Sequence, residues 1–184
     1  MYTDPAFLLY KNAGRNDRRK GQVLEDTLKI KANMSTAVLY DYLVHHSYTS
    51  AEGILGTCFG MLGVIIFLKT SYPLYLVIGL LLIFYLPVNL RYKASLAMHT
   101  NPAFKKPLEY EFGAGGFTVS QGEERGEISW DKCTKAVSTR LSIVIYTGKK
   151  NASILPRKDI GDDLGELITR ITENMDQKKI KIRF

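Results

Sequence analysis

The chain has few of the residues that carry covalent or metal chemistry: its 184 residues include two cysteines, three histidines and one tryptophan. Two cysteines make no disulfide framework, and Cys58 lies in an apolar run whereas Cys133 lies in a polar region. Two lone thiols fit a reducing cytoplasm. We expect no cleavable signal peptide, because the only apolar run near the N-terminus covers residues 6–9.

Catalytic and cofactor signatures are missing as well. The glycine-rich residues 113–116 lack the Gly-Lys-Ser/Thr of a phosphate-binding loop, and no Gly-x-Ser-x-Gly occurs. His45, His46 and His99 have no cysteine or carboxylate at metal-ligand spacing. We therefore expect a protein that is not an enzyme and that uses no cofactor and no metal ion.

Two uncharged apolar runs dominate the middle of the chain. Residues 53–68 and 74–90 hold no charged side chain, and each approaches the roughly 20 residues of a membrane-spanning helix once its flanks are counted. The connection, residues 69–73, is short enough to force a tight reversal. The pattern predicts a transmembrane hairpin of two helices over residues 51–90, with the lipid bilayer as its partner.

Basic residues flank this predicted hairpin, and the net charge of the chain is +7. Lysines and arginines are numerous before residue 53 and after residue 90, whereas the connection holds only Lys69. Positively charged flanks stay on the cytoplasmic side of a membrane. Both termini should therefore be cytoplasmic, and because topology explains much of the charge, we expect no nucleic-acid partner.

Three glycines, Gly56, Gly60 and Gly63, line one side of the first apolar run. Gly56 and Gly60 have the spacing of a small-residue helix-packing motif. One interpretation is close packing against the second run near Gly79. The other is self-association between copies of the chain.

The segments around the hairpin are polar. Residues 1–21 should form a flexible basic segment, and residues 22–50 a strand followed by an amphipathic juxtamembrane helix. The alternation of apolar residues predicts the strand at 23–34, and a helical stripe predicts the helix at 36–48. This helix either leads into the membrane or packs on the soluble domain, and the sequence does not say whether the strand pairs with the C-terminal domain. Residues 91–106 read as a basic connector.

Residues 107–176 consist of short strands and one helix. Frequent turns predict a meandering antiparallel sheet, with strands at residues 108–112, 117–120, 126–130, 134–138, 141–146 and 152–155. Asp163 and Glu166 have the spacing of a capping box at the start of the helix, and the apolar stripe of that helix should cover the sheet. The tail, residues 177–184, alternates isoleucine with basic residues, so it forms an edge strand or hangs free.

Several local patterns in this region carry a resemblance. They are the Gly-Phe strand start at Phe117, the Ile-Ser-Trp strand end at Trp130, the strand at 143–146 and the Ile-Leu-Pro-Arg-Lys segment at 154–158. In this order they resemble the YcxB-like C-terminal domain family of bacterial membrane proteins, over residues 110–175. The resemblance implies two membrane spans in a bacterial cytoplasmic membrane, and a cytoplasmic α+β domain built as a pleckstrin-homology-like (PH-like) antiparallel barrel or sheet capped by a C-terminal helix. It implies architecture rather than chemistry.

Trp130 and four cations are the candidate special residues of this domain. A large ring at a strand end most often fills the core, with its N–H bonded locally. Lys149, Lys150, Arg157 and Lys158 lie on turns, where they either contact anionic lipid or a partner, or are simply solvated.

The function predicted from these patterns is that of a membrane-anchored interaction, regulatory or scaffold module, with a protein partner or self-association. Two alternatives stay open. The module binds anionic lipid headgroups at the inner leaflet, or it is an accessory subunit of a transport or peptide-resistance complex.

Overall fold

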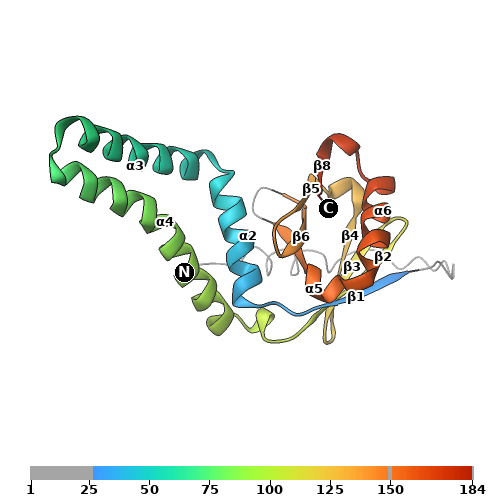
Figure 1. Cartoon of the computed structure of the whole chain (residues 1–184). Helices are drawn as coiled ribbons and strands as arrows, with labels where there is room; N and C mark the ends of the chain where they lie inside the picture. Colours follow the sequence, from blue (N-terminus) through green and yellow to red (C-terminus); the bar gives the residue numbers. More distant parts are fainter. Residues whose placement is uncertain (1–26, 149–150, 184) are drawn as a thin grey trace. The chain divides into compact units, whose positions relative to one another are not determined.

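The computed structural model describes residues 27–148 and 151–183, and the chain divides into two compact units (Figure 1). The helical unit is Thr36–Thr100. The α+β unit contains the described residues before and after it, 27–35 and 101–183 with the gap at 149–150. The predicted flexible segment, residues 1–21, and the predicted strand residues 23–26 lie outside the described residues.

Three helices make up the helical unit: α2 (Thr36–Tyr48), α3 (Ala51–Thr70) and α4 (Pro73–Thr100). The side chain of Ser50 caps α3 by accepting the N–H of Gly53 at 3.2 Å. At the other end Ser71 adopts a left-handed conformation (φ 53°), and its N–H closes the last turn of α3 onto Phe67 O at 2.7 Å. Pro73 then starts α4, a position where its missing N–H costs nothing.

α3 and α4 pack together as a hairpin, and α2 packs against α4 and α3. Leu90 and Ala94 of α4 are buried, and the guanidinium of Arg91 lies 5.9 Å from the ring centroid of Tyr40. The predicted helix at residues 36–48 is confirmed. Residues 91–100 of the predicted basic connector continue α4, because good helix formers follow Arg91 and no breaker occurs before Asn101-Pro102.

The α+β unit begins with sheet A, in which every neighbouring pair is antiparallel. Its strands, in spatial order, are β1 (Leu28–Ala32), β2 (Leu108–Gly113), β3 (Gly116–Gln121) and β4 (Glu124–Ser129). Ile30 of β1 lies opposite Tyr110 of β2, so the N-terminal strand does pair with the C-terminal domain. The alternation predicted for this strand is confirmed, because Leu28, Ile30 and Ala32 are buried while Lys29 and Lys31 are exposed.

Sheet B contains β5 (Lys135–Ser138), β6 (Ser142–Tyr146), β7 (Ala152–Pro156) and β8 (Ile180–Lys181), in the order β7-β6-β5-β8. β8 runs parallel to β5 at the edge, which confirms the edge-strand interpretation of the tail. All five residues of β6 are buried. The described strands form two separate sheets and do not close into one barrel.

Short helices connect these strands: η1 (Pro102–Phe104), η2 (Trp130–Lys132), α5 (Arg157–Ile160), η3 (Gly161–Asp163) and η4 (Gln177–Lys179). The long helix α6 (Leu164–Asn174) starts after Asp163 as predicted, but the predicted capping box is wrong. The Asp163 side chain makes no capping hydrogen bond, and Glu166 binds Arg170 one turn later instead of reaching back. A guanidinium at i+4 offers the carboxylate a stronger, charge-assisted partner than a backbone N–H.

The core of the α+β unit lies between the two sheets and α6. Leu167 and Ile171 of α6 are fully buried in it, together with Phe112, Phe117, Ile143, Ile145 and Leu155 from the sheets. Trp130 is also in this core, with ring centroids 5.6 Å from Phe117 and 6.1 Å from Phe112, and its Nε1–H donates to Gly113 O at 3.0 Å. The core role predicted for Trp130, with a local N–H bond, is confirmed.

Candidate functional site

Only two of the four predicted cations, Arg157 and Lys158, lie within the described residues. Arg157 and Lys158 follow the last residue of β7. Lys149 and Lys150 lie outside the described residues, and their flanking turn, closed by Thr147 N–H and Asn151 O at 3.0 Å, precedes the first residue of β7. Since five strand residues span roughly 15 Å, Arg157 and Lys158 do not share an end of the sheet with that turn.

The structure instead joins Arg157 to two segments that the sequence does not connect with it. The Arg157 guanidinium donates to the carbonyl of Arg183 at 2.9 Å, and the Arg157 N–H donates to Leu141 O at 2.9 Å. The Arg183 N–H donates to Ser138 Oγ at 2.8 Å. These bonds tie the start of α5, the β5–β6 turn and the end of the tail together at one end of sheet B.

We call this region the cationic end; it consists of Arg140, Arg157, Lys158 and Arg183. Arg140, Lys158 and Arg183 are exposed, and Arg157 is half-buried. Arg140 and Arg183 were not among the four cations predicted from the sequence. The alternation of the tail could have indicated that Arg183 points outward, but only the sheet order brings it beside Arg157.

No salt bridge neutralises the cationic end within residues 27–148 and 151–183. Cations of sheet A, by contrast, are paired across its outer face: Lys29 with Glu111 at 3.1 Å, Lys31 with Glu109 at 3.5 Å, and Arg125 with Glu111 at 3.2 Å. Such exposed pairs add little stability. They leave the outer face of sheet A mixed in charge, whereas the cationic end keeps its positive charges unpaired.

The glycines of α3 have two different surroundings. A Cβ added at Gly60 would lie 2.7 Å from Ile83 Cγ1, and one added at Gly63 would lie 3.0 Å from the Cα of Gly79. A Cβ at Gly56 would meet nothing within 4 Å. The predicted packing near Gly79 is therefore present at Gly60 and Gly63 and not at Gly56.

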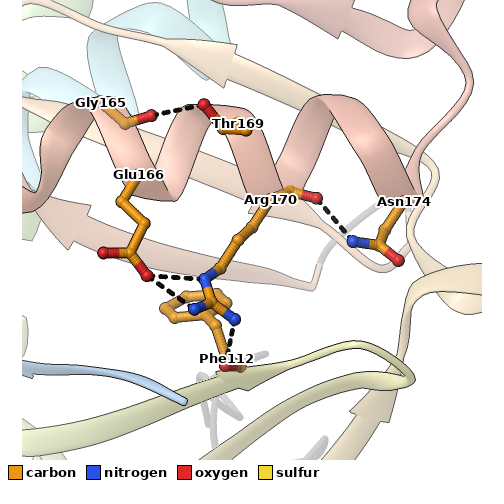
Figure 2. Close-up of polar contacts among 6 residues, drawn as sticks. All are labelled: Phe112, Gly165, Glu166, Thr169, Arg170 and Asn174. Atoms are coloured by element: carbon orange, nitrogen blue, oxygen red, sulfur yellow. Dashed lines mark hydrogen bonds and ion pairs between the residues drawn. The ribbon is translucent and has the colours of Figure 1, made fainter. Parts of the chain in front are cut away.

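Arg170 fastens α6 to sheet A (Figure 2). Its Nε and one terminal nitrogen donate to Glu166 Oε1 at 2.9 and 2.6 Å, and its other terminal nitrogen donates to Phe112 O on β2 at 3.4 Å. The Asn174 amide donates to the carbonyl of Arg170 at 2.9 Å. The Arg170 guanidinium therefore has a structural role, because it holds α6 against sheet A.

Two groups of buried polar side chains in the α+β unit are engaged in hydrogen bonds, whereas the buried hydroxyl oxygen of Thr147 has no hydrogen-bond partner in the described part of the chain. The Tyr110 hydroxyl on β2 forms hydrogen bonds with the Ser153 side chain and the backbone of Ile154 on β7, and burial raises the pKa of Tyr110. Thr139 and Ser142 bond across the β5–β6 turn, with 2.8 Å between their hydroxyl oxygens. These bonds satisfy groups that would otherwise be costly to bury.

Cys133 is buried, and desolvation raises the pKa of its thiol to about 11 despite the opposing charge of Lys179. A thiol of this kind is protonated near neutral pH and is a poor nucleophile.

His46 and His99 each make a local contact on their own helix. His46 stacks on Tyr42 with 5.9 Å between ring centroids, and Nδ1 of His99 lies 2.7 Å from Ser95 O. Within the described part of the chain no three His, Cys, Asp or Glu side chains are grouped as a metal site.

Part of the chain matches a known protein family. Residues 112–169 match the family model described as YcxB-like protein. They run from β2 to α6, so the strand and the two spans that the resemblance also implies lie outside the match. No curated protein and no solved structure matches the chain. The resemblance predicted from the sequence is thus confirmed for residues 112–169, which form a YcxB-like segment of this protein.

Proposed function

We propose that the protein is a membrane-anchored interaction module without enzymatic activity. The α3–α4 hairpin spans the bacterial cytoplasmic membrane. The α+β unit then works at the cytoplasmic face, where it recruits a protein partner or a second copy of the chain.

The observation that carries this proposal is the exposure of the large apolar side chains on α3 and α4. Residues Gly53–Thr70 and Pro73–Thr100 are long and apolar enough to cross a membrane, yet only 11% of each apolar stretch is buried. The exposed side chains include Phe59, Ile65, Leu68, Leu81 and Phe84. A helix this apolar in a water-soluble protein would be buried, so the bilayer is the solvent that fits it.

The length of α4 agrees with this placement. Residues 73–90 precede the first charged side chain, Arg91, and at 1.5 Å per residue they extend about 27 Å, close to the roughly 30 Å hydrocarbon core. The remaining turns of α4, which begin at Arg91, would emerge on the cytoplasmic side, in keeping with the distribution of positive charge.

The strand order supports a PH-like assignment for the α+β unit. Four antiparallel strands of sheet A are followed by three antiparallel strands of sheet B and then by α6, which packs on the core between them. The match of residues 112–169 to the YcxB-like model covers the part of this succession from the end of β2 to the first half of α6. The engagement of Tyr110, Ser153, Thr139 and Ser142 in structural hydrogen bonds supports an interaction role rather than catalysis.

Membrane anchoring is tested by fractionating cells that express the full chain. The wild-type chain should stay with the membranes after alkaline carbonate washing. Replacing Leu81 and Ile65 with arginine should release or destabilise it, whereas Glu124→Arg, a change at an exposed position of β4, should not. A monodisperse wild-type chain in the soluble fraction without detergent would overturn the anchor.

Orientation needs introduced thiols, because Cys133 is too buried to report it. In a background with Cys58→Ala and Cys133→Ala, an impermeant thiol reagent should label Lys69→Cys in intact cells. It should label Glu124→Cys only after permeabilisation.

The interaction role is tested by crosslinking in intact cells, which should give a recurring partner or a dimer. A chain that remains monomeric and uncrosslinked would contradict the interaction role.

A further inference from the structure

We propose that the cationic end of sheet B binds the phosphate groups of anionic membrane lipids. This inference rests on the proposed membrane anchor. It states which ligand the α+β unit binds. The residues assigned to this ligand are those of the cationic end, which differ from the four cations predicted from the sequence.

The tertiary structure brings the residues of the cationic end together from three segments that are distant in sequence. Arg140 comes from the β5–β6 turn, Lys158 from α5 and Arg183 from the tail. Arg157 holds the three segments together through its bonds to Arg183 O and Leu141 O. Arg157 is thus a positioning residue, and the other three side chains are free to face an anion.

The local charge favours an anion at this end. Arg140, Lys158 and Arg183 make no ion pair within the described residues. The nearby Asp159 carboxylate accepts the N–H of Asn33, and Asp162 and Asp163 on the following turn form no ion pair with these cations. Guanidinium groups bind phosphate oxygens in a two-pronged geometry, and the lysine adds a point charge.

Chain connectivity favours a lipid over a diffusing ligand. Only residues 33–35 separate β1 from α2, and residues 101–107 separate α4 from β2. The second connection is also fastened to β3, because the Gln121 amide donates to Ala103 O at 2.7 Å and Lys106 O at 2.8 Å. A hairpin in the bilayer therefore keeps the α+β unit within reach of headgroups at high effective concentration.

The test is hydrogen–deuterium exchange on the full chain in lipid nanodiscs. Discs contain either phosphatidylcholine alone or phosphatidylcholine with about one third phosphatidylglycerol. The charge-reversal variant is Arg140→Glu with Lys158→Glu. The matched control, Lys132→Glu with Lys178→Glu, makes the same charge change at the opposite end of sheet B, where η2 and η4 lead into β5 and β8.

Phosphatidylglycerol should slow exchange at residues 138–142, 157–160 and 180–183 in the wild type and in the control. The charge reversal should weaken this protection by at least about 25-fold, since the loss of each cation near an anionic surface costs roughly fivefold and the two new carboxylates add repulsion. High salt should weaken it as well.

Three results would overturn the inference. The first is equal exchange in both kinds of disc, which is expected if the ligand is an acidic protein. The second is protection that survives the charge reversal. The third is protection in phosphatidylcholine discs when inorganic phosphate is added, which would assign the site to a free anion. A chain that fails to enter nanodiscs would instead contradict the membrane anchor, so the two failures are distinguishable.

Discussion

Tyr110 and Ser153 link the two sheets of the α+β unit from opposite sides of its core. Tyr110 lies on β2 of sheet A and Ser153 on β7 of sheet B, and both side chains are buried. Their hydrogen bond, with that of Tyr110 to the backbone of Ile154, is a polar crosslink within an otherwise apolar cluster. Its position predicts that the link contributes to stability rather than to ligand binding.

Tyr110→Phe should lower the free energy of unfolding of the α+β unit by about 1–3 kcal/mol, because it leaves buried polar partners unsatisfied. Trp130 is the single tryptophan and lies in this core, so its fluorescence during urea denaturation of the full chain in detergent reports on this unit. Adding Ser153→Ala should cost less in the Tyr110→Phe background than alone. Additive costs would show that the two side chains are not coupled.

The α+β unit should lose stability as the pH rises from about 9 to about 11. The Cys133 thiol ionises near its ordinary pKa of 9.0 in the unfolded chain and near 11 in the folded one. The unfolded state therefore loses its proton first, so the stabilisation is complete below pH 9 and is lost as the pH rises. The loss is at most about 3 kcal/mol.

Cys133→Ala should flatten this part of the stability curve, measured by urea denaturation at several pH values. Tyr110 acts in the same direction at higher pH, because burial raises its pKa too, so the comparison with Cys133→Ala isolates the thiol. An unchanged slope in the Cys133→Ala variant would contradict the assignment.

Gly79→Ala should destabilise the hairpin, and Gly56→Ala should not. A Cβ at Gly79 would lie 2.8 Å from the carbonyl oxygen of Gly60 and 2.9 Å from the nitrogen of Val64, both backbone atoms that cannot move aside alone. The overpacking should cost about 1–3 kcal/mol. Gly56 has open space for the methyl group.

The readout for the glycine pair is the temperature at which the full chain in detergent loses its monodisperse peak in size-exclusion chromatography. Only Gly79→Ala should lower it. If Gly56→Ala instead changes the oligomeric state, the Gly56 side of α3 is a contact between copies of the chain, as the self-association interpretation predicts.

Arg157→Gln should loosen the tail. It removes the guanidinium that holds the Arg183 carbonyl, while β8 pairs with β5 over only two residues. Hydrogen exchange at residues 180–183 should become several-fold faster, and exchange in β2 and β3 should stay unchanged. Lys158→Gln, next in sequence but without a bond to the tail, is the matched control; equal acceleration by both variants would point to a general charge effect.

Which face of a strand or helix is buried could be predicted from the sequence, because a periodic pattern of apolar residues depends on burial alone. The alternation around Ile30 fixes which face of β1 is buried, and the stripe through Leu167 and Ile171 fixes the buried face of α6. The uncharged runs locate the apolar parts of α3 and α4, although α4 continues past its run to Thr100. The start of α6 was also predictable, but its capping was not, since Glu166 could bond either to the backbone at the helix start or to Arg170, and in the fold it bonds to Arg170.

What the sequence determined by itself is the set of apolar surfaces: two helices suited to a bilayer and strands with a buried side. Tertiary structure alone decided that residues 28–32 pair with β2, that the tail adds to β5, and that Arg140, Arg157 and Arg183 meet at one end of sheet B. The physical reason is that hydrophobic periodicity is a local property, whereas strand order and the convergence of cations depend on long-range hydrogen bonds between segments that their own sequences do not specify.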